Sequence, residues 1–518
     1  MGAAMVLTAC GGGNTTAPTT GASSGGETQT ASESAESGKI TKTDIVVGQA
    51  SDIVTLDPAG QQDTTSGVLM KHAYSTLLDV DNEGKVVPDL AESYEMKSDT
   101  EYVFKLREDA CFWDGTPVTA QDVKFSLDRA KGMPKTKSNT SKIEEVTVNG
   151  DHEVTIKLTE PYAAFKTIVT QHNLSILSEK AVTEAGDSYG DVDNLLGSGP
   201  FKVTEWVPND HYTLVRNDNY WGEMPIATSI TCRVIPEGSA RTIALEAGEI
   251  DVVWSVDPTD CANVESNPDV KLLSQPSTGI DYVGMNTQKE KFSDKRVRQA
   301  INYALDKQAF VDTIIEGRGL VANSYINAAI PGWTDEVEAY PYDPEKAKEL
   351  LAEAGYPDGF ECSIFVNGDL RTRSAQILQA QLADVGIKVD ISTYEWGALL
   401  DTLNAGEHEM FLLGWSNTSF DPDGSTYQLF YSGNHGATGN RAFFSNDKVD
   451  ELILSAQRES EESKRMELYK ELQFVLHEES PWCPLYYKEN NVGVRADLKG
   501  FTLHAGAQHY LGNCHYEE

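Results

Sequence analysis

The sequence predicts an α/β protein that is built from more than one folding unit, and three observations support this prediction. The chain has 518 residues, which is more than a single hydrophobic core usually organises. Hydrophobic residues make up 40% of the chain and charged residues 24%, as is typical of a folded globular protein. Helical and strand-like patterns alternate along much of the chain, and this order favours a sheet with helical crossover connections.

The first part of the predicted fold contains three strands and two helices. Short segments rich in β-branched or aromatic residues predict strands at 44–49, 102–106 and 154–158. Apolar residues at helical spacing predict helices at 64–78 and 120–130. Thr119 and Asp122 stand at the N-cap and in the first turn of the second helix, where both residue types favour a helix start.

The second half of the chain continues the alternation of helices and strands. Helices are expected at 301–317 with a break at Asp306-Lys307, at 344–355 and at 371–384, and strands at 388–393 and 410–413. Asp343 and Pro344 form the N-cap and first position of the middle helix, and Gly355 and Gly386 end two helices.

The N-terminal segment predicts export and lipid anchoring. Met1 to Ala9 form a short apolar run, and Leu7-Thr8-Ala9-Cys10 resembles the bacterial lipobox, in which the cysteine receives a diacylglycerol. The run has no Lys or Arg and is short for a signal peptide, so we expect the recorded start to be truncated. Residues 11–39, mostly Gly, Ser, Thr, Ala and Glu, predict a flexible tether with a span of roughly 30 Å. We therefore expect a protein on the outer face of the bacterial cell membrane, anchored by lipidated Cys10, or in the periplasm.

Charge and missing motifs exclude several function classes. The formal net charge of -38 repels phosphate backbones, so no nucleic-acid partner is expected. No stretch of about 18 or more apolar residues predicts a transmembrane helix, so the lipid anchor is the expected membrane contact. The metalloprotease, P-loop and dinucleotide-binding motifs are absent, and the one G-x-S-x-G, at 21–25, falls in the predicted tether. We therefore expect no enzyme activity and no cofactor.

Cysteine and histidine spacing predicts no metal centre. The six cysteines after Cys10 are widely scattered and form no C-x-x-C, which leaves one or two disulfides open but indicates neither a zinc ribbon nor a redox motif. Near the C-terminus, His504, His509, Cys514 and His515 follow no compact ligand spacing.

Several long motifs occur in a fixed order from about Ile45 to the C-terminus. They are Val87-Pro-Asp-Leu-Ala-Glu-Ser-Tyr-Glu, Tyr102-Val-Phe-Lys-Leu-Arg, Phe112-Trp-Asp-Gly-Thr-Pro-Val-Thr-Ala-Gln-Asp-Val-Lys-Phe-Ser-Leu-Asp-Arg-Ala, Gly197-Ser-Gly-Pro-Phe, Asn219-Tyr-Trp-Gly, Phe292-Ser-Asp-Lys-Arg-Val-Arg-Gln-Ala-Ile-Asn-Tyr-Ala-Leu-Asp-Lys, Leu382-Ala-Asp-Val-Gly-Ile and Gly414-Trp. Together they closely resemble family 5 of the bacterial extracellular solute-binding proteins, which holds the dipeptide-, oligopeptide- and nickel-binding components of ABC importers.

This resemblance implies a two-lobed, periplasmic-binding-protein-like clamp of type II, cluster C, also called a venus-flytrap. Lobe I is expected to combine 40–84, 195–278 and 484–518, with an extra subdomain at 85–194, and lobe II to span 279–483. Chain crossings near Gly279 and near 481–485 are expected to form the hinge, with the ligand held between the lobes. The implied partners are ABC permease subunits with their cytoplasmic ATPases, and the implied state is a monomer.

The resemblance also implies where charged ends of a peptide are held, and here the sequence departs from the family pattern. The Asp that pairs with the α-amino group of a peptide matches Thr418, and the Arg that holds the carboxylate of a dipeptide matches Phe365. Substitutes lie nearby: Asp421 and Asp423 for a cation, and Arg371 for a carboxylate. The predicted ligand-binding residues are therefore Asp57 at the rim of lobe I, Arg371, Trp415, Thr418, Asp421, Asp423 and Tyr427.

Three functions stay open at this point. The first is capture of a peptide or modified peptide for import. The second is capture of a different solute by the same clamp, such as a metal chelate, an oligosaccharide or a cationic osmolyte, with His435 as the residue that would serve a chelate. The third is an extracellular enzyme or an adhesin, which no motif supports.

Overall fold

The computed structural model describes residues 39–518. Cys10 and nearly all of the predicted tether lie outside the described residues, so the predictions made for them rest on the sequence alone. Within the described range, no helix combines the length and apolar character that a membrane span requires.

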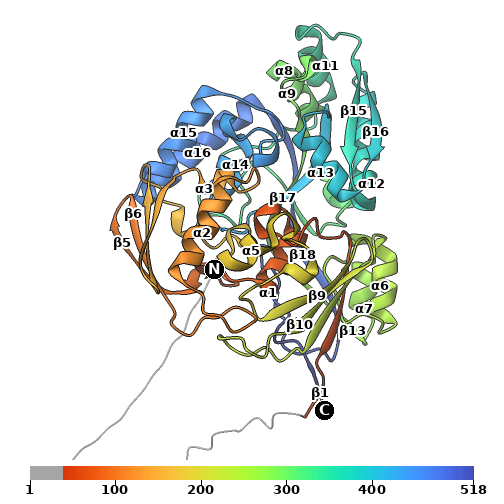
Figure 1. The fold of residues 1–518 in the computed structure, drawn as a ribbon. Helices are drawn as coiled ribbons and strands as arrows, with labels where there is room; N and C mark the ends of the chain where they lie inside the picture. The colour runs from red at the N-terminus through yellow and green to blue at the C-terminus, as the bar shows by residue number, and fades with distance from the viewer. Residues whose placement is uncertain (1–38) are drawn as a thin grey trace, which may run out of the picture. The chain divides into compact units, whose positions relative to one another are not determined.

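The largest sheet within residues 40–518 has eleven strands, some parallel and some antiparallel (Figure 1). Its strands, in spatial order, are β16 (Ile387–Thr393), β15 (Phe360–Val366), β17 (Met410–Ser416), β13 (Val270–Met285), β18 (Trp482–Arg495), β12 (Val252–Val253), β2 (Asp44–Gln49), β11 (Ser229–Val234), β10 (His211–Arg216) and β9 (Phe201–Val207), with β14 (Gly319–Val321) paired to β18. β15 runs parallel to β16 and β17, and β2 runs parallel to β11 and β12. The sheet is therefore parallel in part, as the helix–strand alternation predicts, with antiparallel strands between the parallel groups.

Two long antiparallel strands, β13 and β18, join the two halves of the sheet. Their ladder is regular up to Pro276, which pairs with Glu489, and resumes at Ile280, which pairs with Tyr487. Beyond this irregularity β13 also pairs with β17, so the neighbours of β13 change at the same place. We infer that the chain crosses between lobes here. On this inference one crossing lies at 276–280, which includes the proposed Gly279, and the other lies at 487–489, past the proposed 481–485.

Separate hydrophobic clusters pack against the two halves of the sheet and in the inserted subdomain, and lobe II has a second large cluster among its helices within 396–479. Ile45, Val252 and Val492 are fully buried in the core of lobe I, and Ile301 and Leu378 in that of lobe II. The inserted subdomain has a separate antiparallel sheet and a core that contains Phe104, Phe112 and Phe165. Its strands are β5 (Ala91–Ser98), β6 (Glu101–Leu106), β8 (Glu153–Leu158) and β7 (Ile143–Gly150), and the hairpin β3 (Leu78–Val80) and β4 (Val86–Pro88) precedes them.

Helices cover these sheets. Lobe I contains α1 (Thr64–Ala73), α6 (Gly238–Glu246) and α7 (Cys261–Ser266), and the small sheet of β1 (Ile40–Lys42) and β19 (Tyr516–Glu517). The inserted subdomain contains α2 (Ala120–Lys131), α3 (Lys137–Thr140), α4 (Phe165–Ile168) and α5 (Glu179–Ala185). Lobe II contains α8 (Glu290–Ser293), α9 (Lys295–Ala304), α10 (Lys307–Thr313), α11 (Pro344–Glu353), α12 (Gly368–Ala383), α13 (Trp396–Asn404), α14 (Asp423–Phe430), α15 (Asp447–Arg458) and α16 (Glu462–Glu479).

The predicted helix boundaries are largely confirmed. The Thr119 backbone N–H and hydroxyl both donate to Asp122 at the start of α2. Asp343 accepts a hydrogen bond from the Lys346 N–H at the start of α11, and Gly355 ends that helix with a φ of +93°. The helix predicted at 64–78 is too long, because α1 ends at Ala73 and the apolar residues after it continue as buried extended chain.

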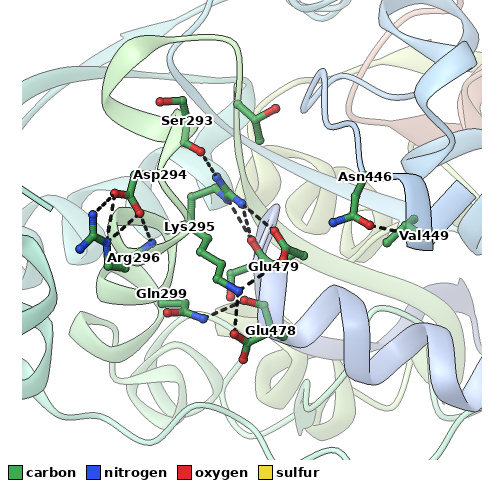
Figure 2. A network of polar contacts seen from close by, with 12 residues as sticks. Ser293, Asp294, Lys295, Arg296, Gln299, Asn446, Val449, Glu478 and Glu479 are labelled. Atoms are coloured by element: carbon green, nitrogen blue, oxygen red, sulfur yellow. Dashed lines mark hydrogen bonds and ion pairs between the residues drawn. The ribbon is translucent and has the colours of Figure 1, made fainter.

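The N-terminus of α9 and the C-terminus of α16 meet just before β18 begins (Figure 2). Lys295 reaches Glu478 at 2.7 Å and Glu479 at 3.4 Å, and Gln299 donates to the Glu478 carbonyl. Arg298 is 3% exposed and donates to the carbonyls of Glu479, Phe292 and Ser293. This junction holds the last turn of α16, and with it the start of β18, against α9.

Candidate functional site

A cavity of about 400 Å³ lies between the two halves of the large sheet. Lobe I and the inserted subdomain contribute 61–68 at the start of α1, 171–173, 254–256 and 507–509. Lobe II contributes 367–371, the start of α13, and 413–418 at the end of β17. The walls therefore come from both sides of the β13–β18 crossing, which is where a two-lobed clamp holds its ligand.

Three of the seven predicted ligand-binding residues line this cavity. Arg371 extends from α12 with its guanidinium 5.8 Å from the ring of Trp396, and its buried Nε has no hydrogen-bond partner among the described residues. Thr418 donates its hydroxyl to Gln171 of the inserted subdomain at 2.8 Å. Trp415 uses its indole N–H to hold the carbonyl of Gly424 at 3.0 Å, so only its ring remains for a ligand.

The other four predicted residues lie outside the cavity lining, and protein partners occupy their polar groups. Asp57 forms a two-pronged ion pair with Arg129, at 3.0 and 2.6 Å. Asp421 forms the same kind of pair with Arg465, whose side chain is 4% exposed. Asp423 accepts from Tyr162 at 2.5 Å and from Gln457 at 2.9 Å, and Tyr427 lies 3.0 Å from Ser141.

Two of these four residues belong to a polar contact between the inserted subdomain and lobe II. We name it the closure contact, and it consists of Asn139, Ser141 and Tyr162 on one side and Asp423, Tyr427 and Gln428 on the other. Ion pairs also join the lobes elsewhere, among them Arg373 to Asp257 at 2.6 Å, Arg318 to Glu265 at 2.7 Å and Arg458 to Glu160. The lobes are therefore in direct contact around the cavity, which is the closed arrangement of a clamp.

The cavity also contains charged residues that the sequence did not single out. Asp63 caps α1 by accepting from the Ser66 N–H at 2.9 Å, while its second oxygen is buried without a partner among the described residues. Arg441 is 7% exposed, and its Nε donates to Asn404 at 3.0 Å. Lys488 and Asp281 face the cavity as an ion pair of 3.2 Å.

Burial shifts the pKa values of these cavity residues. Loss of water raises the pKa of Asp63, although hydrogen bonds from Ser66 and the Lys135 charge act in the opposite direction. Loss of water also lowers the pKa of Arg441, although the charge of Asp63 acts in the opposite direction. Burial lowers the pKa of His172 and of His509 to about 3, so both imidazoles are neutral at pH 7. The cost of burial exceeds these attractions, since the pKa of Asp63 stays raised and that of Arg441 stays lowered, and a ligand charge in direct contact would reduce this cost.

Several neutral polar atoms of the lining are also without partners in the described part of the chain. They are Gln62 Oε1, His172 Nδ1, Trp254 Nε1, Trp396 Nε1 and Gln508 Oε1. Trp254 stacks on His509, with ring centres 5.2 Å apart. A ligand with both hydrogen-bond donors and acceptors would satisfy these atoms. Within residues 39–518, no group of three or more His, Cys, Asp or Glu is arranged to hold a metal ion.

Two charged residues of the cavity lining, Asp63 and Arg441, are absent from the sequence prediction for local reasons. Asp63 precedes the predicted helix start at Thr64, where an Asp is expected as an N-cap. The residue type therefore does not indicate that its second carboxylate oxygen faces a cavity. Arg441 lies in a loop where no periodic pattern places it. His435, considered for a metal chelate, instead contacts the carbonyl of Phe444 and the Ser445 hydroxyl, outside the cavity lining.

Comparisons with known proteins agree over nearly the whole chain. The family model for bacterial extracellular solute-binding proteins, family 5 Middle, matches residues 85–437. The glutathione-binding protein GsiB of Escherichia coli (strain K12) is 32% identical over 479 residues, which cover 89% of this chain and 92% of GsiB. The periplasmic binding protein DppA from Helicobacter pylori, solved with peptide STSA, has a TM-score of 0.88 and 28% identity and covers 93% of this chain and 99% of DppA. AgaA from A. tumefacien R10, solved with agropinic acid, has a TM-score of 0.86 and 27% identity, over 92% and 99% of the two chains.

These matches confirm the resemblance seen in the motifs and the two-lobed α/β fold. They identify a binding protein rather than an enzyme, with an extracytoplasmic place of action. The chain belongs to family 5 of the bacterial extracellular solute-binding proteins.

Proposed function

We propose that this protein captures a short peptide or a modified peptide between its lobes and delivers it to the permease of an ABC importer. The observation that carries the proposal is a set of three charged groups in the cavity lining, Asp63, Arg371 and Arg441, that form no ion pair within 4.0 Å among the described residues. A peptide carries an ammonium and a carboxylate, so it brings a partner for each sign of charge.

Size and polarity support a short ligand. A cavity of about 400 Å³ is near the lower end of the range of roughly 300–1,000 Å³ for pockets that enclose drug-sized ligands. Such a space suits two or three residues better than a long extended chain. The unpaired indole, amide and imidazole atoms of the lining match the amide groups of a peptide backbone.

The related proteins support the same class of ligand. GsiB is a glutathione-binding protein, and DppA was solved with the peptide STSA. AgaA was solved with agropinic acid, so a non-peptide acid is the alternative ligand for the same clamp. An oligosaccharide would leave the buried charges of Asp63 and Arg441 unpaired, and a cationic osmolyte would leave Arg441 unpaired, so both fit less well.

The proposed location is the outer face of the cell membrane, where a diacylglycerol on Cys10 and the segment 11–39 would hold the binding domain near the permease. Support for this part comes from Leu7-Thr8-Ala9-Cys10 and from the Gly- and Ser-rich composition after it. The extracytoplasmic character of the family is consistent with such an anchor.

Mass spectrometry and calorimetry together test the proposed ligand. The full chain is purified and examined by native mass spectrometry for a retained molecule. It is then titrated with dialanine, trialanine, glutathione and, as an uncharged control, maltose. We expect at least one peptide to bind and maltose not to bind. A retained non-peptide solute, combined with no binding of any peptide, would contradict the proposal.

A further inference from the structure

The cavity has an excess of basic side chains, although the protein as a whole is strongly acidic. Four basic residues line it, Arg318, Arg371, Arg441 and Lys488, against three acidic residues, Asp63, Asp281 and Glu489. The whole chain has a formal net charge of -38. A locally positive lining within so acidic a protein needs a specific reason, because acidic side chains are the common ones elsewhere in this sequence.

Two of the four basic residues already have a carboxylate partner. Lys488 lies 3.2 Å from Asp281, and Arg318 lies 2.7 Å from Glu265. Among residues 39–518, no carboxylate lies within 4.0 Å of Arg371 or of Arg441. The cavity therefore presents two guanidinium groups that the protein itself does not neutralise.

Arg441 has the greater need for an anionic partner, because it is the more deeply buried of the two arginines. Its side chain is nearly fully buried, and the Asn404 amide oxygen, which is uncharged, is its hydrogen-bond acceptor. A buried cation without an anion in direct contact is costly, and burial lowers the pKa of Arg441 even though the Asp63 charge acts to raise it. Arg371 lines the same cavity as Arg441. One ligand in this cavity can therefore contact both cations.

The acidic side chains of the cavity offer a site for one cation rather than two. Asp281 is held by Lys488. Glu489 is half-buried and close to Arg318, whose pKa its charge helps to raise. Asp63 remains, with one buried oxygen free of hydrogen bonds within the described residues. The lining therefore matches two anionic groups and one cationic group.

We infer that the ligand is a short peptide with two carboxylates and one ammonium group, that is, a peptide with an acidic side chain or a γ-linked glutamyl residue. Arg371 and Arg441 each hold one carboxylate, and Asp63 holds the ammonium. Arg441 is then the residue that selects acidic peptides over neutral ones. This inference rests on the proposed function, because it names the class of peptide that the same cavity takes.

Matched peptides test the inference by isothermal calorimetry on the full chain. The pairs are Glu-Ala-Ala with Gln-Ala-Ala, Ala-Glu-Ala with Ala-Gln-Ala, and glutathione with its glycine ethyl ester. The two Glu/Gln pairs differ by one carboxylate at nearly constant shape, and the glutathione pair differs by one carboxylate and the added ethyl group. We expect the dicarboxylate of at least one pair to bind 10-fold or more tightly than its neutral partner. Arg441→Gln should bring that ratio close to one, whereas Arg296→Gln, which removes an equal charge on the outside of α9, should leave it unchanged.

The outcomes distinguish peptide capture from selectivity for acidic peptides. Equal affinities within every pair overturn the inference and leave peptide capture standing. No binding by any peptide overturns the proposed function and the inference with it. If Arg441→Gln has a much lower melting temperature, the affinity ratios measured on the unaltered chain still test the selectivity, because they require no variant.

Discussion

The Tyr162 hydroxyl donates a 2.5 Å hydrogen bond to the Asp423 carboxylate and thereby joins the inserted subdomain to lobe II. Both side chains are buried, and the closest backbone link beside them runs from the Ala163 N–H to the Gln457 carbonyl. The two residues lie in the closure contact rather than in the cavity, so they act on the position of the lobes and not on the ligand itself.

Tyr162→Phe should weaken ligand binding without changing the cavity. The variant removes one hydrogen bond to a charged group in the closed state, worth about 1.5–3 kcal/mol, and this loss shifts the lobes toward the open state. Calorimetry should show weaker binding, and small-angle scattering should show a larger radius of gyration at the same ligand concentration.

The matched control for this variant is Tyr74→Phe, which removes a hydrogen bond to the Leu56 carbonyl inside lobe I. That variant should lower the melting temperature but leave the ligand affinity unchanged. Equal losses of affinity in both variants would show that Tyr162 acts through overall stability and not through closure.

Asp423 should also make stability depend on pH. Burial and the neighbouring Asp421 raise the pKa of Asp423 to about 6, from 3.8 for an exposed carboxyl. Because the folded state binds this proton more tightly than the unfolded state, the contribution of Asp423 is full below about pH 4 and is lost as pH rises through about 6. The difference amounts to about 3 kcal/mol at most.

Melting curves of the full chain between pH 4 and 8 check this expectation. Burial also raises the pKa of Asp89, to about 7, so the wild type contains more than one contribution of the same sign. The comparison is therefore with Asp423→Asn, which keeps the shape but cannot titrate. The wild type should gain stability relative to this variant as pH falls from 7 to 5, and parallel curves would exclude a raised pKa.

The junction in Figure 2 predicts that replacing Arg298 of α9 lowers the free energy of unfolding strongly, whereas replacing Arg296 changes this free energy little. Arg298→Met leaves the Glu479 carbonyl at the end of α16 and the Phe292 and Ser293 carbonyls of α8 without this donor, so the free energy of unfolding should fall by about 2–4 kcal/mol. Arg296→Gln breaks an exposed pair with Asp294 and should change it little. Urea titrations of both variants decide, and equal losses would contradict this assignment.

Sequence motifs predicted the architecture well because they report backbone requirements. The pair Asp343-Pro344 and the glycine at 355 fix the ends of α11 through local geometry, which any tertiary context must respect. The apolar run after α1 illustrates the limit, since burial in an extended conformation overrode the helical spacing there.

The site was harder to predict because the role of a charged side chain depends on which partner reaches it. Asp421 and Asp57 have the residue type of a ligand anchor, but Arg465 and Arg129 arrive from distant parts of the chain and occupy them. Arg371 has no such partner and stays free in the cavity. Spacing along the sequence does not distinguish these cases.

Cys10→Ser should release the protein from the membrane. The expectation follows from Leu7-Thr8-Ala9-Cys10, because the serine hydroxyl is not a substrate for attachment of diacylglycerol to a cysteine thiol. Fractionation of cells that express the wild type or the variant, with a radiolabelled fatty acid, measures both location and lipid. A wild type that stays with the membrane without the label would exclude this anchor.

The residue that holds the ligand ammonium can be identified by comparing two aspartates. Asp63→Asn removes the charge that faces the cavity but keeps the oxygen that accepts from the Ser66 N–H, so α1 should stay capped and the melting temperature should change little. Affinity for an ammonium-bearing peptide should fall by roughly 2–5 kcal/mol, because the ligand cation loses its buried partner. Asp421→Asn instead breaks the buried pair with Arg465, so the free energy of unfolding should fall by about 3–5 kcal/mol while direct contact with the ligand is unaffected.

Calorimetry with a peptide and with its N-acetylated form gives the decisive measurement, since acetylation removes the ammonium. The wild type should discriminate between the two peptides and Asp63→Asn should not. Should discrimination persist in Asp63→Asn and vanish in Asp421→Asn at an unchanged melting temperature, the ammonium site is Asp421, as the sequence alone had suggested.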